Sequence, residues 1–193
     1  MTVLEVFGRI REHLGTMTDR MRCFSTYEFQ AEGWLKAECM ALLDGLKKSG
    51  AIGGVEREVS ALHRKKIDLV VHCRYGRHWV ELKHWLIGPQ KGQTFNPKSY
   101  VTALEDEFEK FEAVKAGDRA WILALCTARP DDSAWTSALT HFNFNSENAP
   151  WFLDSLEEPS RYSPEWFLGV LHAQGLEAQS GKGELLTPPP HTT

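Results

Sequence analysis

The chain has 193 residues, a length that fits one compact domain and leaves little room for a second. Its apolar content of 42% and net charge of −4 are those of a globular protein and exclude a disordered one. Four cysteines without a C-x-x-C pair predict reduced thiols rather than a disulfide framework. No segment has the apolar length of a signal peptide or a membrane span, so a cytoplasmic protein without membrane contact is expected.

A helix followed by three strands is predicted for the first half of the chain. Apolar residues recur at helical spacing over 25–48, and this helix should end near Gly50. After Gly54 the period becomes that of strands, which we expect over 55–62, 66–73 and 78–86. The turn at 74–77 joins the last two strands as a hairpin.

A second helix and a buried strand should follow. Asn96 can cap this helix with Pro97 at its first position, and Gly117 should end it. The run over 120–126 is continuously apolar, as in a strand buried on both faces. The predicted order is therefore αβββαβ, an α/β fold with a mixed central sheet flanked by helices.

The C-terminal part is expected to add helices to that core. A short helix is predicted over 132–140, and a second is predicted from Ser163 to Leu171. The residues over 178–193 are rich in Gly, Ser and Pro and predict a flexible tail. Residues 1–177 are therefore expected to form a single domain.

Three charged residues lie within the predicted hairpin. Strand alternation places Asp68 on the face opposite to Ile67 and Leu69, and it places Glu81 and Lys83 on one shared face. Buried charges are costly unless they are paired or hold a metal ion. A buried ion-pair cluster without a catalytic role is the alternative to a site.

The turn also predicts a register for the hairpin. If its centre lies between Tyr75 and Gly76, Asp68 faces Lys83 and Glu81 is the diagonal neighbour of Asp68, roughly 7 to 8 Å away between Cα atoms. Two carboxylates at that separation can hold one Mg²⁺ or Mn²⁺, which are hard cations that prefer oxygen ligands. Lys83 would then orient the attacking water or stabilise the developing charge at a phosphodiester.

Ile67-Asp68 followed by Glu81-Leu82-Lys83, set on a hairpin between helices, resembles the PD-(D/E)xK nucleases, which are restriction-endonuclease-like. The resemblance covers residues 25–126, with Ile67 standing where the family name has Pro. It implies that Asp68 and Glu81 bind the metal together with the main-chain carbonyl of Leu82. It also implies that Lys83 assists the water.

Many members of that family carry a further catalytic glutamate on the first helix. Three glutamates lie near the apolar face of the predicted helix, and the helical period favours Glu28 and after it Glu32. In the loop over 88–98, Gln90, Lys91 and Lys98 are donors suited to phosphates and sugars, although a polar loop without such a role is equally expected.

Two functions remain open from the sequence. The first is a metal-dependent nuclease whose expected substrate is DNA, with RNA as the other nucleic acid to test. The second is a catalytically inactive module of the same fold that binds nucleic acid or a protein partner. Cutting both strands of a duplex needs two active sites, which a homodimer would supply.

Overall fold

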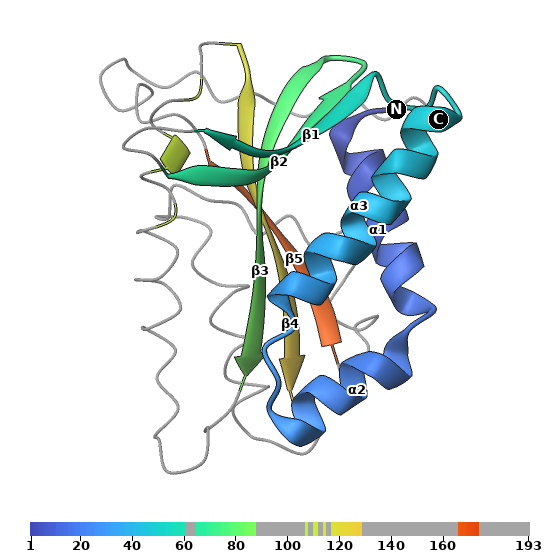
Figure 1. The fold of residues 1–193 in the computed structure, drawn as a ribbon, viewed down its shortest axis with the longest axis vertical. Helices are drawn as coiled ribbons and strands as arrows, with labels where there is room; N and C mark the ends of the chain where they lie inside the picture. Colours follow the sequence, from blue (N-terminus) through green and yellow to red (C-terminus); the bar gives the residue numbers. More distant parts are fainter. Residues whose placement is uncertain are drawn as a thin grey trace, which may run out of the picture.

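The computed structural model describes residues 1–60, 65–87, 107, 110, 111, 114, 117–128 and 166–173. Within this part, helices and a mixed sheet form an α/β fold (Figure 1). The helices are α1 (Val3–Gly15), α2 (Thr18–Tyr27) and α3 (Glu32–Lys48). The strands are β1 (Gly54–Ser60), β2 (Lys66–Cys73), β3 (Gly76–Ile87), β4 (Arg119–Ala128) and β5 (Trp166–Ala173).

The five strands lie in the order β1-β2-β3-β4-β5. β3 and β4 are parallel, and the other neighbouring pairs are antiparallel. The predicted strands over 66–73, 78–86 and 120–126 are thus confirmed as β2 to β4. The predicted strand over 55–62 is confirmed as β1 up to Ser60, and residues 61 and 62 lie outside the described residues. Side chains from β2, β3 and β4 pack against the helices, as in the edge-to-face contact between Phe7 of α1 and Trp121 of β4, whose ring centroids are 5.6 Å apart.

The predicted single helix over 25–48 is wrong in its first turns. α2 ends at Tyr27, and Glu28 adopts the left-handed conformation with φ 56°. α3 then begins at Glu32, after the N–H of Ala31 donates to Nδ1 of His84 on β3, at 3.0 Å. A bond to a strand more than fifty residues away along the chain therefore holds the break, which local helical period does not reveal.

The hairpin exists, but its predicted register is wrong by two residues. Arg74 and Tyr75 form a two-residue turn, and Cys73 pairs with Gly76, which has φ 120°. If this register is continued by one pair beyond Leu69 and Val80, Asp68 lies opposite Glu81 rather than opposite Lys83. A slip of two residues keeps every side chain on its own face of the sheet. The predicted shared face of Asp68 and Glu81 consequently survives the error.

The predicted helix from Ser163 to Leu171 is also wrong, because residues 166–173 form strand β5 beside β4. Trp166, Leu168 and Val170 are buried and alternate with period two. This short apolar run fits either period, and the free edge of β4 supplies the hydrogen bonds that decide between them. The predicted helix over 132–140, most of the helix after Asn96 and the tail over 178–193 lie outside the described residues.

All four cysteines are free thiols, as expected from their spacing. Cys39 and Cys126 are buried, Cys73 is partly buried and Cys23 is exposed. No helix in the described part of the chain is long and apolar enough to cross a membrane.

Candidate functional site

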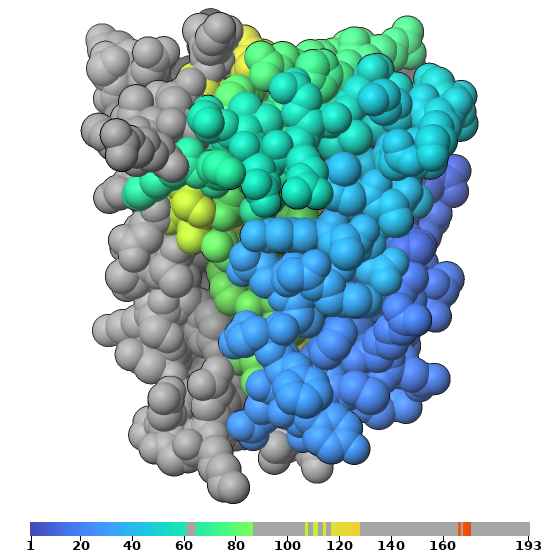
Figure 2. All heavy atoms as spheres, in the orientation of Figure 1, coloured from blue at the N-terminus to red at the C-terminus, as the bar shows by residue number. Residues whose placement is uncertain are grey.

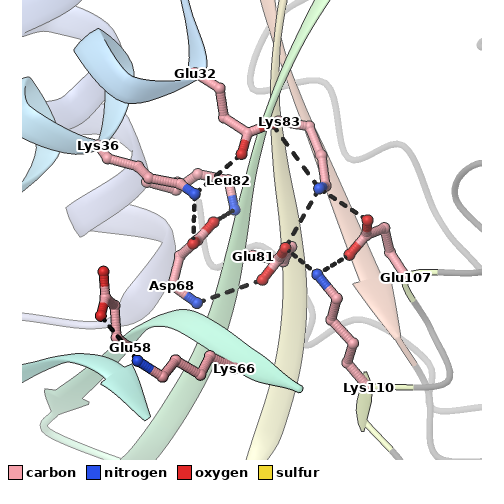
Figure 3. Close-up of polar contacts among 10 residues, drawn as sticks. All are labelled: Glu32, Lys36, Glu58, Lys66, Asp68, Glu81, Leu82, Lys83, Glu107 and Lys110. Carbon is pink, nitrogen blue, oxygen red and sulfur yellow. Dashed lines mark hydrogen bonds and ion pairs between the residues drawn. The ribbon is translucent and has the colours of Figure 1, made fainter. Parts of the chain in front are cut away.

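The candidate site lies where β2 and β3 stop pairing. Their ladder runs from Cys73 and Gly76 to Leu69 and Val80. At the next position the N–H of Asp68 donates to Oε2 of Glu81, at 3.3 Å, and the N–H of Leu82 donates to Oδ2 of Asp68, at 2.9 Å (Figure 3). Each carboxylate thus accepts a hydrogen bond from a main-chain N–H of the opposite strand, where a regular ladder would have a main-chain carbonyl as the acceptor. The exchange brings the two acids together between the strands.

Asp68 also receives a lysine from α3. Nζ of Lys36 lies 2.8 Å from Oδ1 of Asp68 and 3.0 Å from Oε1 of Glu32 (Figure 3). Burial alone would lower the pKa of Lys36, but its hydrogen bonds to Asp68 and Glu32 outweigh burial and raise it. Lys36 is therefore a cation held against one of the two central acids.

Glu81 is the least exposed acid of the site, with 3% of its side chain accessible. Oε1 of Glu81 lies 2.5 Å from Nζ of Lys110 and 3.4 Å from Nζ of Lys83. Burial, together with the negative charge of Asp68, raises the pKa of the Glu81 carboxyl to about 7, although Lys110 acts in the opposite direction. Glu81 hence lacks enough neighbouring positive charge to ionise freely near neutral pH.

Glu107 closes a ring of alternating charges with Glu81 and two lysines. Oε1 of Glu107 lies 2.8 Å from Nζ of Lys83, and its other oxygen contacts Lys110. Burial lowers the pKa of Lys83, but the hydrogen bond and charge of Glu107 outweigh this effect and raise it. Lys83 therefore stays protonated at neutral pH, a state that suits a hydrogen-bond donor rather than a base.

The structure brings together four of the charged side chains named from the sequence. Asp68, Glu81 and Lys83 form one cluster, and Glu32 reaches it with Oε2 at 3.9 Å from Nζ of Lys83. Glu28, favoured over Glu32 by helical period, lies before the break between α2 and α3 rather than on α3, and its part in the site stays a prediction. Gln90, Lys91 and Lys98 lie outside the described residues.

Sequence reasoning missed Lys36, Glu107 and Lys110. Lys36 is four residues after Glu32, a spacing that places both on one helical face and could have identified it. Glu107 falls at helical spacing among the apolar residues of the predicted helix after Asn96, where an acid is unexpected. Lys110 follows three residues later on the same face.

The histidines and tryptophans near the hairpin have structural partners. His72 bonds to Glu56 through Nε2, at 2.6 Å, and lies away from the cluster. Nδ1 of His84 accepts the N–H of Ala31, so Nε2 carries the proton and donates to Oγ1 of Thr127, at 2.9 Å. Burial lowers the pKa of His84 to about 4, which keeps the ring neutral. Trp79 and Trp85 are buried, which matches the core role expected for large aromatics in a sheet.

The donor set of the cluster fits a hard divalent cation. Carboxylate oxygens of Asp68 and Glu81 are the ligand type that Mg²⁺ and Mn²⁺ prefer. The raised pKa of Glu81 indicates that more positive charge between the acids would be favourable. In the described part of the chain, no group of three or more His, Cys, Asp or Glu side chains is arranged around a metal position.

Comparison of the chain with protein-family models, with curated proteins and with solved structures yields no match. The geometry of the cluster therefore carries the functional argument.

Glu81→Gln should change how stability depends on pH. Burial raises the pKa of Glu81 from its ordinary value of 4.5 to about 7 in the folded protein, so the folded state binds more protons than the unfolded state between these values. Stability of the wild type is therefore lost as pH rises through this window. Glu81→Gln removes that loss and should gain about 1–3 kcal/mol over the wild type between pH 5 and pH 8. Urea unfolding at several pH values measures the difference.

The matched control is Glu12→Gln, whose side chain is 67% exposed on α1. Its stability should follow the wild type within about 0.5 kcal/mol at each pH. If the unfolding free energy of Glu81→Gln depended on pH in the same way as that of the wild type, Glu81 would ionise without a free-energy cost, which would contradict the effect of its burial.

Proposed function

We propose that this chain is a metal-dependent nuclease that hydrolyses phosphodiester bonds, with DNA as its expected substrate. The observation that carries this proposal is the meeting of Asp68, Glu81 and Lys83 where β2 and β3 part. The order of elements from α3 through β4 supports a restriction-endonuclease-like fold, as the resemblance to the PD-(D/E)xK nucleases implies. The parallel pairing of β3 and β4 requires a crossover connection, which suits the helix predicted between them.

Asp68 and Glu81 would hold the cation, together with the main-chain carbonyl of Leu82. A bound Mg²⁺ or Mn²⁺ supplies positive charge at the scissile phosphate and makes water more acidic. The N–H of Leu82 already faces Asp68, and the N–H and C=O of one strand residue point to the same edge. The carbonyl of Leu82 is thus aimed toward the gap between the strands, where the two carboxylates lie.

Lys83 would contribute an ammonium group rather than a base. Its pKa is raised, so it can donate to a phosphate oxygen or to water and stabilise negative charge as it develops. Glu107 holds Nζ of Lys83 at 2.8 Å, and Glu32 lies at 3.9 Å on the other side. These two acids limit the positions that the ammonium group can take, which favours a fixed geometry for the reaction.

One observation favours the second candidate, an inactive module that binds nucleic acid or a protein partner. Lys36 and Lys110 already lie within ion-pair distance of Asp68 and Glu81. A fully paired cluster can be structural and need no cation. The two candidates differ in whether a divalent cation replaces these lysines and whether phosphodiester bonds are cut.

Cleavage of labelled single-stranded, duplex and branched DNA, with an RNA control, tests the proposal in Mg²⁺, Mn²⁺ and EDTA. We expect products only with metal. Asp68→Asn and Lys83→Met should each lower the rate at least about 100-fold, because the first removes a metal ligand and the second removes a charge at the reacting phosphate.

The matched controls are Asp44→Asn and Lys48→Met, which change an exposed ion pair on α3 without touching the cluster. Both should cleave at the wild-type rate. Intact substrate under all conditions, or cleavage that persists in EDTA and in Asp68→Asn, would contradict the proposal of a metal-dependent nuclease and favour the inactive binding module.

Glu32→Gln and Glu28→Gln separate the two candidate helix glutamates. Glu32 lies 3.0 Å from Lys36 and 3.9 Å from Lys83, whereas Glu28 ends the preceding helix. We expect the rate to fall about tenfold or more in Glu32→Gln and to stay within about twofold in Glu28→Gln. The opposite ranking in single-turnover assays would show that α2 supplies the helix acid.

A further inference from the structure

Two aromatic rings are exposed beside the cluster, at the connection between α2 and α3. The side chains of Tyr27 and Phe29 are 65% and 59% exposed. Their rings are stacked, with centroids 6.0 Å apart and an interplanar angle of 29°. Large aromatic side chains contribute most when they are covered, so two neighbouring exposed rings indicate a surface that meets a partner.

The connection that carries these rings is fixed to the sheet. The N–H of Phe29 donates to the carbonyl of Phe24, at 3.0 Å, and the N–H of Ala31 donates to His84. Phe24 also packs against Trp34 and His84, with ring centroids 5.0 Å and 6.0 Å apart. The partly buried Phe24 on one side and the buried bond of Ala31 on the other thus position a pair of rings that themselves remain outside.

The pair lies close to the cluster. Phe29 is three residues before Glu32, so at most about 10 Å of chain separates Phe29 from Glu32. Oε2 of Glu32 lies 3.9 Å from Nζ of Lys83. The α2–α3 connection lies at one end of the molecule, beside the C-terminal ends of β3 and β4, and forms part of the surface (Figures 1 and 2).

We propose that Tyr27 and Phe29 stack on unpaired bases of a single-stranded nucleic acid whose backbone passes the cluster at Lys83. This inference rests on the proposed nuclease function and names its substrate class. Aromatic rings bind the flat faces of unpaired bases with little dependence on sequence. In a duplex these faces are covered by neighbouring base pairs, so exposed rings beside a phosphate-cutting site favour an unpaired strand.

Fluorescence anisotropy tests the proposal with the full chain in EDTA, so that no cleavage occurs. The probes are a labelled oligothymidylate and a labelled DNA duplex of equal length. The wild type should bind the single strand more tightly than the duplex. Tyr27→Ala/Phe29→Ala should weaken single-strand binding about 10- to 100-fold and leave duplex binding within about twofold, because each stacked base contributes a large share of the affinity.

The matched control is Tyr75→Ala. Tyr75 is 69% exposed in the β2–β3 turn, at the opposite end of β3 from His84, and its removal should leave binding within about twofold of the wild type. Since all three rings are exposed, the melting temperatures should stay close to that of the wild type, which verifies folding.

The outcomes separate this inference from the proposed function. Equal affinity for single strand and duplex, or single-strand binding unaffected by Tyr27→Ala/Phe29→Ala, would overturn the stacking role while metal-dependent cleavage still supports the nuclease. A change in oligomeric state of the double variant with unchanged affinity would assign the rings to an interface between copies and also overturn it. Absence of both binding and cleavage would overturn both proposals.

Discussion

Two carboxylates lie almost out of contact with water where β2 and β3 stop pairing, and their repulsion governs the rest of the site. Asp68 and Glu81 each accept a main-chain N–H from the opposite strand, which draws them into the gap. Burial and mutual repulsion then raise the pKa of Glu81 to about 7. Three lysines, Lys36, Lys83 and Lys110, surround the pair and offset part of this cost. Such an arrangement costs stability, which is typical of a site kept for chemistry.

The fold supplies these groups from elements that are distant in sequence. α3 contributes Glu32 and Lys36 on one side, and the segment before β4 contributes Glu107 and Lys110 on the other (Figure 3). The break between α2 and α3 gives α3 its start at Glu32, held by the bond from Ala31 to His84. The same break exposes the aromatic rings proposed to bind unpaired bases. One local feature of the chain thus serves both the acid cluster and the adjacent surface.

The central residues could be predicted from sequence because strand alternation is insensitive to the details of the turn. Asp68 and Glu81 stay on one face whether the register is the predicted one or the observed one, which differ by two residues. The register itself depends on the turn, where Gly76 adopts φ 120° and makes Arg74 and Tyr75 the loop. No pattern in the surrounding residues distinguishes that turn from one centred a residue later.

Long-range contacts decided the features that were predicted wrongly or missed. Helical spacing extends upstream of Ala31, yet α3 begins only at Glu32, because the N–H of Ala31 is bonded to His84. The apolar run at 166–173 suits a helix or a strand, and the edge of β4 selects the strand. Helical spacing pairs Lys36 with Glu32 and Lys110 with Glu107, but the contacts of these lysines with Asp68 and Glu81 depend on the tertiary fold. Local periodicity does not show contacts between distant parts of the chain.

Anomalous diffraction from crystals grown with Mn²⁺ tests most directly whether the paired acids form a cation site. We expect one Mn²⁺ bound by carboxylate oxygens of Asp68 and Glu81, with Nζ of Lys36 or Lys110 moved from the oxygen that it now contacts. An empty cluster, in which both lysines keep their present contacts while Mn²⁺ binds elsewhere or not at all, would contradict a cation site between the two acids.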